Sequence, residues 1–207
     1  MENNPSAHQK MQQEMTIGRW MFNPFVRIAG IRSLVIGLAG IVAAGLVAGG
    51  AGIRFDGLLD VHAGNEVALW VPVVEGMVNW VVFTLLLMVV ALLFSKSAVR
   101  LVDIAGTQAM ARLPLIPVAA ICALPWIRDA FDGLAEALLN GQPAGIPWMG
   151  VAVGAVVTLA GVVWMVALMW KAFSISCNMK GGRAIALFIL AVLIGEVVTV
   201  LLRGRIG

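Results

Sequence analysis

Residues 69–94 read LWVPVVEGMVNWVVFTLLLMVVALLF, an apolar run that contains a single charged residue, Glu75. An α-helix rises 1.5 Å per residue, so about 20 apolar residues in helical form match the hydrocarbon thickness of a bilayer. This stretch is therefore predicted to be a transmembrane helix. It also places one acid inside the hydrocarbon region.

Four other apolar stretches extend this pattern along the chain. The complete set of predicted spans is 33–53, 69–94, 113–127, 146–170 and 184–202. The third is short and interrupted by prolines, which leaves open whether it crosses fully. The composition agrees with a membrane protein, since 61% of residues are hydrophobic and only 12% are charged, against roughly 25% in soluble domains. We predict an all-α polytopic bundle of five transmembrane helices.

This bundle accounts for nearly the whole chain as one domain, residues 19–207. Residues 1–18 are polar and are expected to form a disordered cytoplasmic tail. They lack the apolar core and cleavage pattern of a signal peptide, so the first span is expected to be retained.

Basic residues are distributed unevenly between the connectors. Alternate connectors collect ten lysines and arginines on one side of the membrane and four on the other. The richer side holds Lys10, Arg19, Arg27, Arg32, Lys96, Arg100, Arg112, Lys171, Lys180 and Arg183. The positive-inside rule places that side in the cytoplasm. We therefore predict a multi-pass protein with its N-terminus in the cytoplasm and its C-terminus outside.

Three segments between or before the spans have amphipathic spacing. Residues 16–32 are predicted either to lie along the inner membrane surface or to be an ordinary basic flank of the first span, with Pro24 starting a helix. Residues 95–112 suggest an inner-surface helix that runs into the third span. Residues 127–141 suggest a short amphipathic helix on the outer surface.

The first span is rich in small residues at a spacing of four, as in Gly45 and Gly49. In lipid, such residues let helix backbones approach closely. The spacing predicts a tight bundle and leaves open whether one small-residue face binds a second copy.

Two acids fall at membrane depth, Glu75 and Glu196. A charged side chain at the centre of a membrane helix costs roughly 2.5–3.5 kcal/mol, so these are the leading functional candidates. Both lie roughly 9 Å below the predicted outer boundary, so they could face one another or a shared cavity. Asn79 lies one turn below Glu75. Two interpretations stay open: a proton, ion or metal pathway, or a structural role in which the acids are protonated or bond to donors such as Asn79 and Thr199.

The first connector adds Asp56, Asp60 and His62. Carboxylate oxygens and an imidazole can hold a divalent cation. The alternative is a set of solvated loop residues, with His62 bonded locally. Both interpretations stay open.

Signatures of soluble enzymes and of nucleic-acid binding are missing from the sequence. With only two histidines, the chain contains no His-Glu-x-x-His, and it contains no Gly-x-Ser-x-Gly. The basic residues follow the topology and do not form a patch that could track nucleic acid. Cys122 and Cys177 are expected to be too far apart for a disulfide. We predict no enzymatic activity and no nucleic-acid partner.

Two connectors carry a family resemblance. VDIAG at 102–106 is followed by ARLP at 111–114, and NMKGGRA at 178–184 precedes the fifth span. With five spans and a cytoplasmic N-terminus, the chain resembles the Yip family, membrane proteins named for binding Ypt/Rab GTPases. For the eukaryotic members the resemblance implies a role in membrane organisation or trafficking, whereas for the prokaryotic branch it implies no settled activity. This glycine-rich chain with its short N-terminus is more like the prokaryotic branch, which implies an inner-membrane location. The departure from the long cytoplasmic tails of the eukaryotic members puts GTPase binding in doubt.

Taken with the residues, the resemblance favours a non-enzymatic membrane protein with a scaffold or membrane-organising role. Its expected partners are the lipid bilayer and either a second copy or another membrane protein. The alternative is a small transporter, or an ion- or metal-binding membrane protein, that uses the acids near the outer face. No cofactor is expected apart from a divalent metal under that alternative.

Overall fold

In the computed structural model the described residues are 17–63, 68–140 and 146–203. The predicted tail of residues 1–18 therefore lies outside them, apart from Ile17 and Gly18. These two residues begin α2 (Ile17–Phe22), a short exposed helix that is followed by the 3-10 helix η1 (Pro24–Val26). Pro24 starts a helix, as predicted, although the helix has only one turn.

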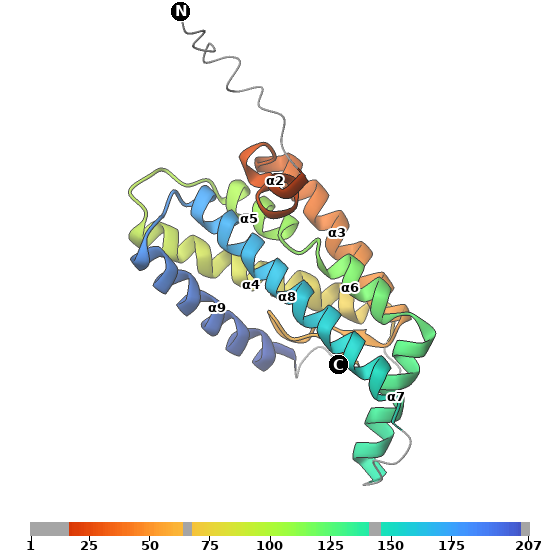
Figure 1. The fold of residues 1–207 in the computed structure, drawn as a ribbon. Helices are drawn as coiled ribbons and strands as arrows, with labels where there is room; N and C mark the ends of the chain where they lie inside the picture. Colours follow the sequence, from red (N-terminus) through yellow and green to blue (C-terminus); the bar gives the residue numbers. More distant parts are fainter. Residues whose placement is uncertain (1–16, 64–67, 141–145, 204–207) are drawn as a thin grey trace, which may run out of the picture.

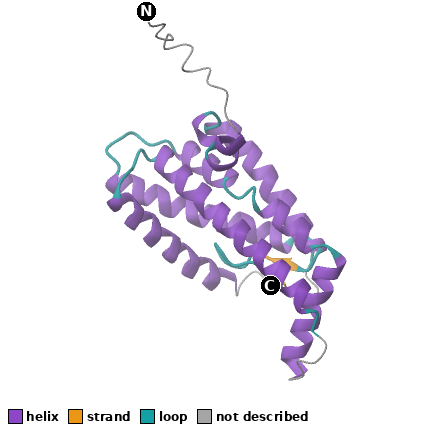
Figure 2. Ribbon diagram, in the orientation of Figure 1, coloured by secondary structure: helices purple, strands orange, loops and turns teal. Residues whose placement is uncertain are grey.

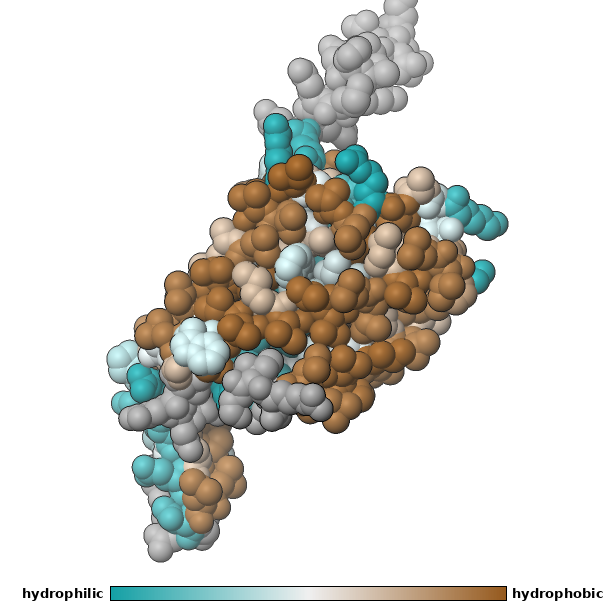
Figure 3. Space-filling model, turned by 180° about the vertical axis from the view of Figure 1, so that it is seen from behind, coloured by the Kyte–Doolittle hydropathy of each residue, from teal (hydrophilic) through white to brown (hydrophobic). Residues whose placement is uncertain are grey.

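The described residues are almost entirely helical (Figure 2), which confirms the all-α fold. Five helices are long and apolar enough to cross a membrane, so the chain is a multi-pass membrane protein. The helices that form them are α3 (Gly30–Gly50), α4 (Val71–Phe94), α5 (Leu101–Met110) with α6 (Leu115–Cys122), α8 (Trp148–Ser176) and α9 (Gly182–Arg203). Figure 3 shows apolar side chains across the middle of one face, with polar side chains gathered toward its two ends.

The helices pack around a central pair, α3 and α5. Helix α3 also contacts α4 and α6, and α8 lies against α5 and α6. Helix α9 packs mainly on α4 at one edge of the bundle. Helix α7 (Pro125–Asn140) packs on α8 at the other edge and projects beyond the neighbouring helices (Figure 1).

The third membrane helix differs from its prediction. It runs over Leu101–Cys122, with a tight turn between α5 and α6, and not over 113–127. The predicted surface helix in residues 95–112 is therefore wrong, because α5 is buried inside the bundle. In the 18-residue window tested for this membrane helix, 72% of the residues are buried, whereas the corresponding share is at most 39% in each of the other four membrane helices. Helix α5 combines alanine, glycine and buried polar residues, which lowers its hydropathy. A helix of moderate hydropathy is typical of the membrane surface, and the prediction of a surface helix followed from that.

The remaining boundaries are close to the predicted ones. Helix α3 begins at Gly30, three residues before the predicted start, and α8 continues to Ser176 beyond the predicted end at Trp170. The amphipathic helix predicted after the third span is confirmed as α7. Pro125 begins this helix, as proline commonly does at a first helical position.

The small residues of α3 face neighbours within the same chain. A Cβ added at Gly37 would lie 2.5 Å from the Cβ of Ala109 in α5, and one at Gly45 would lie 2.7 Å from the Cα of Val73 in α4. Backbone contact this close explains why glycine stands at both positions. These glycines of α3 thus contact helices of the same chain.

The bundle has two distinct ends. The loop end contains α7 and the connector between α3 and α4, where β1 (Ile53–Arg54) pairs antiparallel with β2 (His62–Ala63). The opposite end, called the basic end below, contains the connectors 95–100 and 177–181, together with the start of α3.

Candidate functional site

The connector between α3 and α4 folds back into the bundle at the loop end. Ile53 and the four consecutive residues from Phe55 to Leu58 are buried, and Arg54 between them is half-buried. Buried backbone amides and carbonyls need hydrogen-bond partners, since an unpaired group costs free energy comparable to a lost hydrogen bond. The side chains of α4 and α9 supply those partners.

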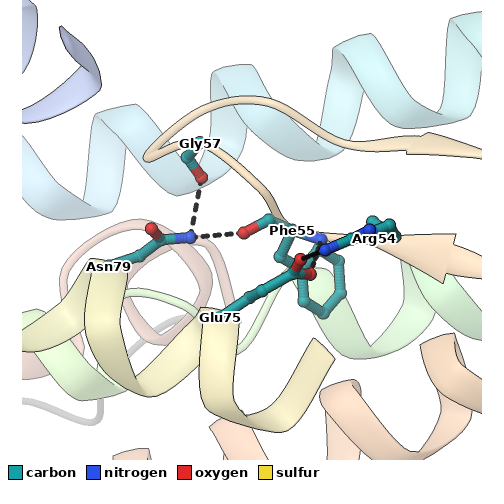
Figure 4. A network of polar contacts seen from close by, with 5 residues as sticks. All are labelled: Arg54, Phe55, Gly57, Glu75 and Asn79. Carbon is teal, nitrogen blue, oxygen red and sulfur yellow. Dashed lines mark hydrogen bonds and ion pairs between the residues drawn. The ribbon is translucent and has the colours of Figure 1, made fainter. Parts of the chain in front are cut away.

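Glu75 of α4 binds the start of this connector (Figure 4). Its Oε1 accepts a hydrogen bond from Nε of Arg54 at 2.8 Å and another from Nη2 of the same side chain. Its Oε2 accepts from the backbone N–H of Phe55 at 2.9 Å. The carboxylate is 2% exposed and the arginine side chain 20%. The arginine thus supplies the opposite charge that a buried carboxylate requires.

Asn79 lies one helical turn further along α4 and holds the next part of the connector. Its Nδ2 donates to the carbonyl oxygens of Phe55 at 2.6 Å and Gly57 at 2.8 Å (Figure 4). One amide group therefore satisfies two buried carbonyls.

Helix α9 binds the far side of the same connector through two residues. The backbone N–H of Leu59 donates to Oε2 of Glu196 at 2.8 Å, and that of Leu58 donates to Oγ1 of Thr199 at 3.0 Å. The Thr199 hydroxyl in turn bonds the carbonyl oxygen of Gly195 at 2.9 Å. A Cβ added at Gly57 would collide with Oε1 of Glu196, so only glycine lets the backbone approach this closely.

The two glutamates thus bind one segment from two helices and, in the bonds of the described residues, do not bind each other. The segment Arg54–Leu59 lies between them and is called the clamped loop below. Asn79 and Thr199 were considered as donors to the acids, but the structure shows them bonded to the clamped loop instead. The donors to the acids are Arg54 and two backbone amides.

The candidate metal ligands are not brought into one described cluster. Asp56 is buried and Asp60 is exposed, while the side chain of His62 lies outside the described residues. Across the part of the chain that is described, no group of three histidine, cysteine or acidic side chains is placed to hold a metal ion. Metal binding by these residues stays a prediction.

Sequence reasoning did not identify the clamped loop. It treated Arg54 as a basic connector residue, whereas Arg54 pairs with Glu75. The available signal was the apolar character of Phe55 and Leu58, which lie in a predicted connector that would otherwise be exposed to water.

Two further buried polar residues in the third membrane helix were also missed. Gln108 donates from Nε2 to the carbonyl oxygen of Met169 in α8 at 3.0 Å. Arg112 is 2% exposed and lies in the turn between α5 and α6, although the sequence placed it in the second connector. Both could be predicted only by recognising α5 as a membrane helix.

At the basic end, hydrogen bonds join two connectors. Oγ of Ser95 donates to the carbonyl oxygen of Cys177 at 2.9 Å, and Nδ2 of Asn178 donates to Oγ of Ser97 at 2.9 Å. The Cys177 side chain is fully covered, and this burial raises the pKa of its thiol to about 12. The connectors before α5 and before α9 therefore meet at one end of the bundle.

No protein-family profile, curated protein or solved structure matches this chain.

Proposed function

We propose that this chain is a non-enzymatic membrane-organising scaffold that binds anionic lipid or a membrane-protein partner through its basic end. The observation that carries the proposal is the set of exposed basic side chains around the two joined connectors. They are Lys96, Arg100, Lys171, Lys180 and Arg183. Residues 95–100 and 177–183 contain no acid. A basic surface next to membrane helices attracts anionic headgroups by about 1 kcal/mol per residue.

The proposed orientation places the basic end and the N-terminus in the cytoplasm and the C-terminus outside. The distribution of lysine and arginine supports it. The structure moves Arg112 into the bundle and pairs Arg54 with Glu75. Arg112 was counted on the side rich in lysine and arginine and Arg54 on the other side. Removing both therefore leaves the excess of basic residues on the same side.

The resemblance to the Yip family supports the same function. Of the residues that carry it, 178–184 lie in the connector before α9 and at its start, 102–106 lie in the first turns of α5, and 111–114 form the turn between α5 and α6. We propose a prokaryotic-type member in the inner membrane, with a second copy or another membrane protein as the protein partner.

The lipid arm of this proposal is tested by counting bound lipids. Purified protein in mixed micelles is offered phosphatidylglycerol and phosphatidylcholine, and retained lipids are measured by native mass spectrometry. We expect preferential retention of phosphatidylglycerol, weakened in the variant Lys96→Gln, Lys180→Gln, Arg183→Gln. The matched control is Arg128→Gln, an exposed arginine at the loop end. If the wild type and the triple variant retain the same amount of phosphatidylglycerol, lipid binding at the basic end is contradicted.

The partner arm is tested by cross-linking in native membranes. A photo-cross-linker at the exposed position 98, next to the Ser97 that accepts the bond from Asn178, should capture a second copy or one defined membrane protein. The same cross-linker at the exposed position 129 of α7 is the control. A monomer without adducts at either position, together with no lipid preference, would rule out the scaffold.

The alternative function is a small transporter or ion-binding protein that uses Glu75 and Glu196. The hydrogen bonds of both carboxylates to the clamped loop argue against it, because an ion pathway requires groups free to exchange partners. Proteoliposome flux and metal analysis, for wild type and for Glu75→Gln with Glu196→Gln, distinguish the two. Flux or bound metal that disappears in the variant would favour the transporter.

A further inference from the structure

A cavity of about 560 Å³ lies at the loop end between α7, α8 and the connector that follows α3. This volume is in the range typical of small-molecule sites, roughly 300–1,000 Å³. Most of its wall is apolar. The main apolar side chains are Ile53, Leu59, Phe131, Leu134, Leu159 and Val162.

The cavity opens at the depth of the hydrocarbon. Ala155 and Leu159 of α8 both line it and are exposed, Leu159 by 66%. Leu159 follows Trp148, the first residue of α8, by eleven positions, which is about 16 Å along a helix. Because the hydrocarbon core is roughly 30 Å thick, an exposed side chain at this position contacts lipid chains and not water. An apolar ligand can therefore enter the cavity from the bilayer.

The polar side chains of the described wall already have partners. Oγ1 of Thr158 lies 3.7 Å from Sγ of Cys122, within hydrogen-bond range for sulfur. Asp132 pairs with Arg128 at 3.9 Å, and Asp60 has an interaction partner of its own. A buried water typically needs about three hydrogen bonds, and apolar cavities without such partners stay dry. The wall thus favours an apolar ligand over water or a polar molecule.

We propose that this cavity binds one acyl chain of a bilayer phospholipid, which enters beside Leu159 and packs between α7, α8 and the connector. Moving a chain from the bilayer to an apolar wall gains little hydrophobic free energy, since both surroundings are apolar. The favourable term is the van der Waals contact that an unfilled wall would lack. The site therefore recognises the chain and not the headgroup.

This inference is independent of the lipid binding proposed for the basic end, because the cavity lies at the opposite end of the bundle. The variant Lys96→Gln, Lys180→Gln, Arg183→Gln removes the basic end and leaves the cavity unchanged. After delipidation in detergent, this variant is offered phosphatidylcholine or phosphatidylglycerol, and retained lipid is counted by native mass spectrometry. We expect about one lipid per chain with either headgroup.

Substitutions that fill the cavity test the location in the same background. Ala155→Phe places a ring in the cavity and should weaken lipid retention about tenfold. The matched control is Ala160→Phe, which places the same ring on an exposed alanine of α8 that does not line the cavity. Leu134→Trp fills the cavity from α7 and should have the same effect as Ala155→Phe. Thermal unfolding identifies a variant that has lost its fold.

A photo-reactive chain tests the site in a bilayer. The wild-type protein is placed in nanodiscs that contain phosphatidylcholine with a diazirine in one chain, and adducts are mapped by mass spectrometry. Leu159 should be labelled severalfold more than Val197 of α9, which is similarly exposed, at 60%, and does not line the cavity.

Three results would overturn the proposal. Equal lipid retention by Ala155→Phe and Ala160→Phe would place the retained lipid elsewhere. Equal labelling of Leu159 and Val197 would show only the contact that any lipid-facing surface makes. A dimer that retains no lipid would show that a second copy covers the cavity.

Discussion

The pairing of Arg54 with Glu75 decides whether a carboxylate can remain buried beneath the clamped loop. Removing one member of a buried pair leaves the other charge uncompensated, which costs about 3–5 kcal/mol. Because Arg54 keeps some contact with solvent, the loss of stability in Arg54→Met should lie near the low end of this range, about 3 kcal/mol. The measurement is the midpoint of thermal unfolding in a fixed detergent.

Two further variants serve as controls for that prediction. Arg128→Met removes the exposed arginine of α7 and should change the midpoint little. The double variant Glu75→Gln with Arg54→Met should lose less stability than the sum of the losses in the two single variants, because it leaves no buried charge without a partner. Additive losses would show that the two side chains do not depend on each other.

Burial of Cys177 predicts its chemical behaviour. The thiolate is the reactive form, and a pKa raised from 9.0 to about 12 lowers its population about a thousandfold at neutral pH. Cys177 in the folded protein should therefore react with iodoacetamide far more slowly than an ordinary cysteine, and its rate should still be rising above pH 9 instead of levelling off there. Mass spectrometry of the tryptic peptide, with detergent-unfolded protein as the positive control, measures the rate. Rapid labelling that tracks a pKa near 9 would contradict the buried position.

At the scale of elements, close contact between α3 and α5 holds the centre of the bundle together. Alanine favours a helix by about 1 kcal/mol over glycine, yet Gly37→Ala should destabilise the protein, by about 1–3 kcal/mol. The added Cβ would lie 2.5 Å from the backbone of Ala109, which cannot move aside as a side chain could. Gly50→Ala on the same helix is the control, because nothing lies within 4 Å of its added Cβ.

The contrast between these two glycines is measured by thermal unfolding of both variants in one detergent. Gly50→Ala should be neutral or slightly stabilising. If Gly37→Ala behaves in the same way, α3 and α5 do not pack as closely as described.

Four of the five membrane helices could be predicted from the sequence, because long apolar runs record contact with lipid directly. Helix α5 could not be predicted in this way, because a helix that is buried among other helices does not contact lipid and does not need a long apolar run. It combines Gly106, Gln108 and Ala109, which suit helix contacts and interhelical hydrogen bonds better than lipid. Helix α7 was predictable for the opposite reason, since one face is apolar and the other charged.

At the scale of the whole molecule, the candidate site was only partly predictable. Depth along a helix follows from residue counting, so Glu75 and Glu196 were placed near the same end of the bundle. The connection between them was not predictable, because it depends on the path of the clamped loop and on how α4 and α9 face one another. Leu58 and Thr199 bond across 141 positions of sequence, and no local pattern records such a contact.

The account as a whole depends on the clamped loop being held inside the bundle by α4 and α9. Hydrogen–deuterium exchange of residues 54–59 in nanodiscs measures this most directly, since backbone amides that are bonded and buried exchange slowly. We expect the amides of Phe55, Leu58 and Leu59 to be strongly protected, and their protection to fall in Glu75→Gln with Glu196→Gln while the central part of α8 stays protected. Exchange at the rate of an open connector in the wild-type protein would contradict the account.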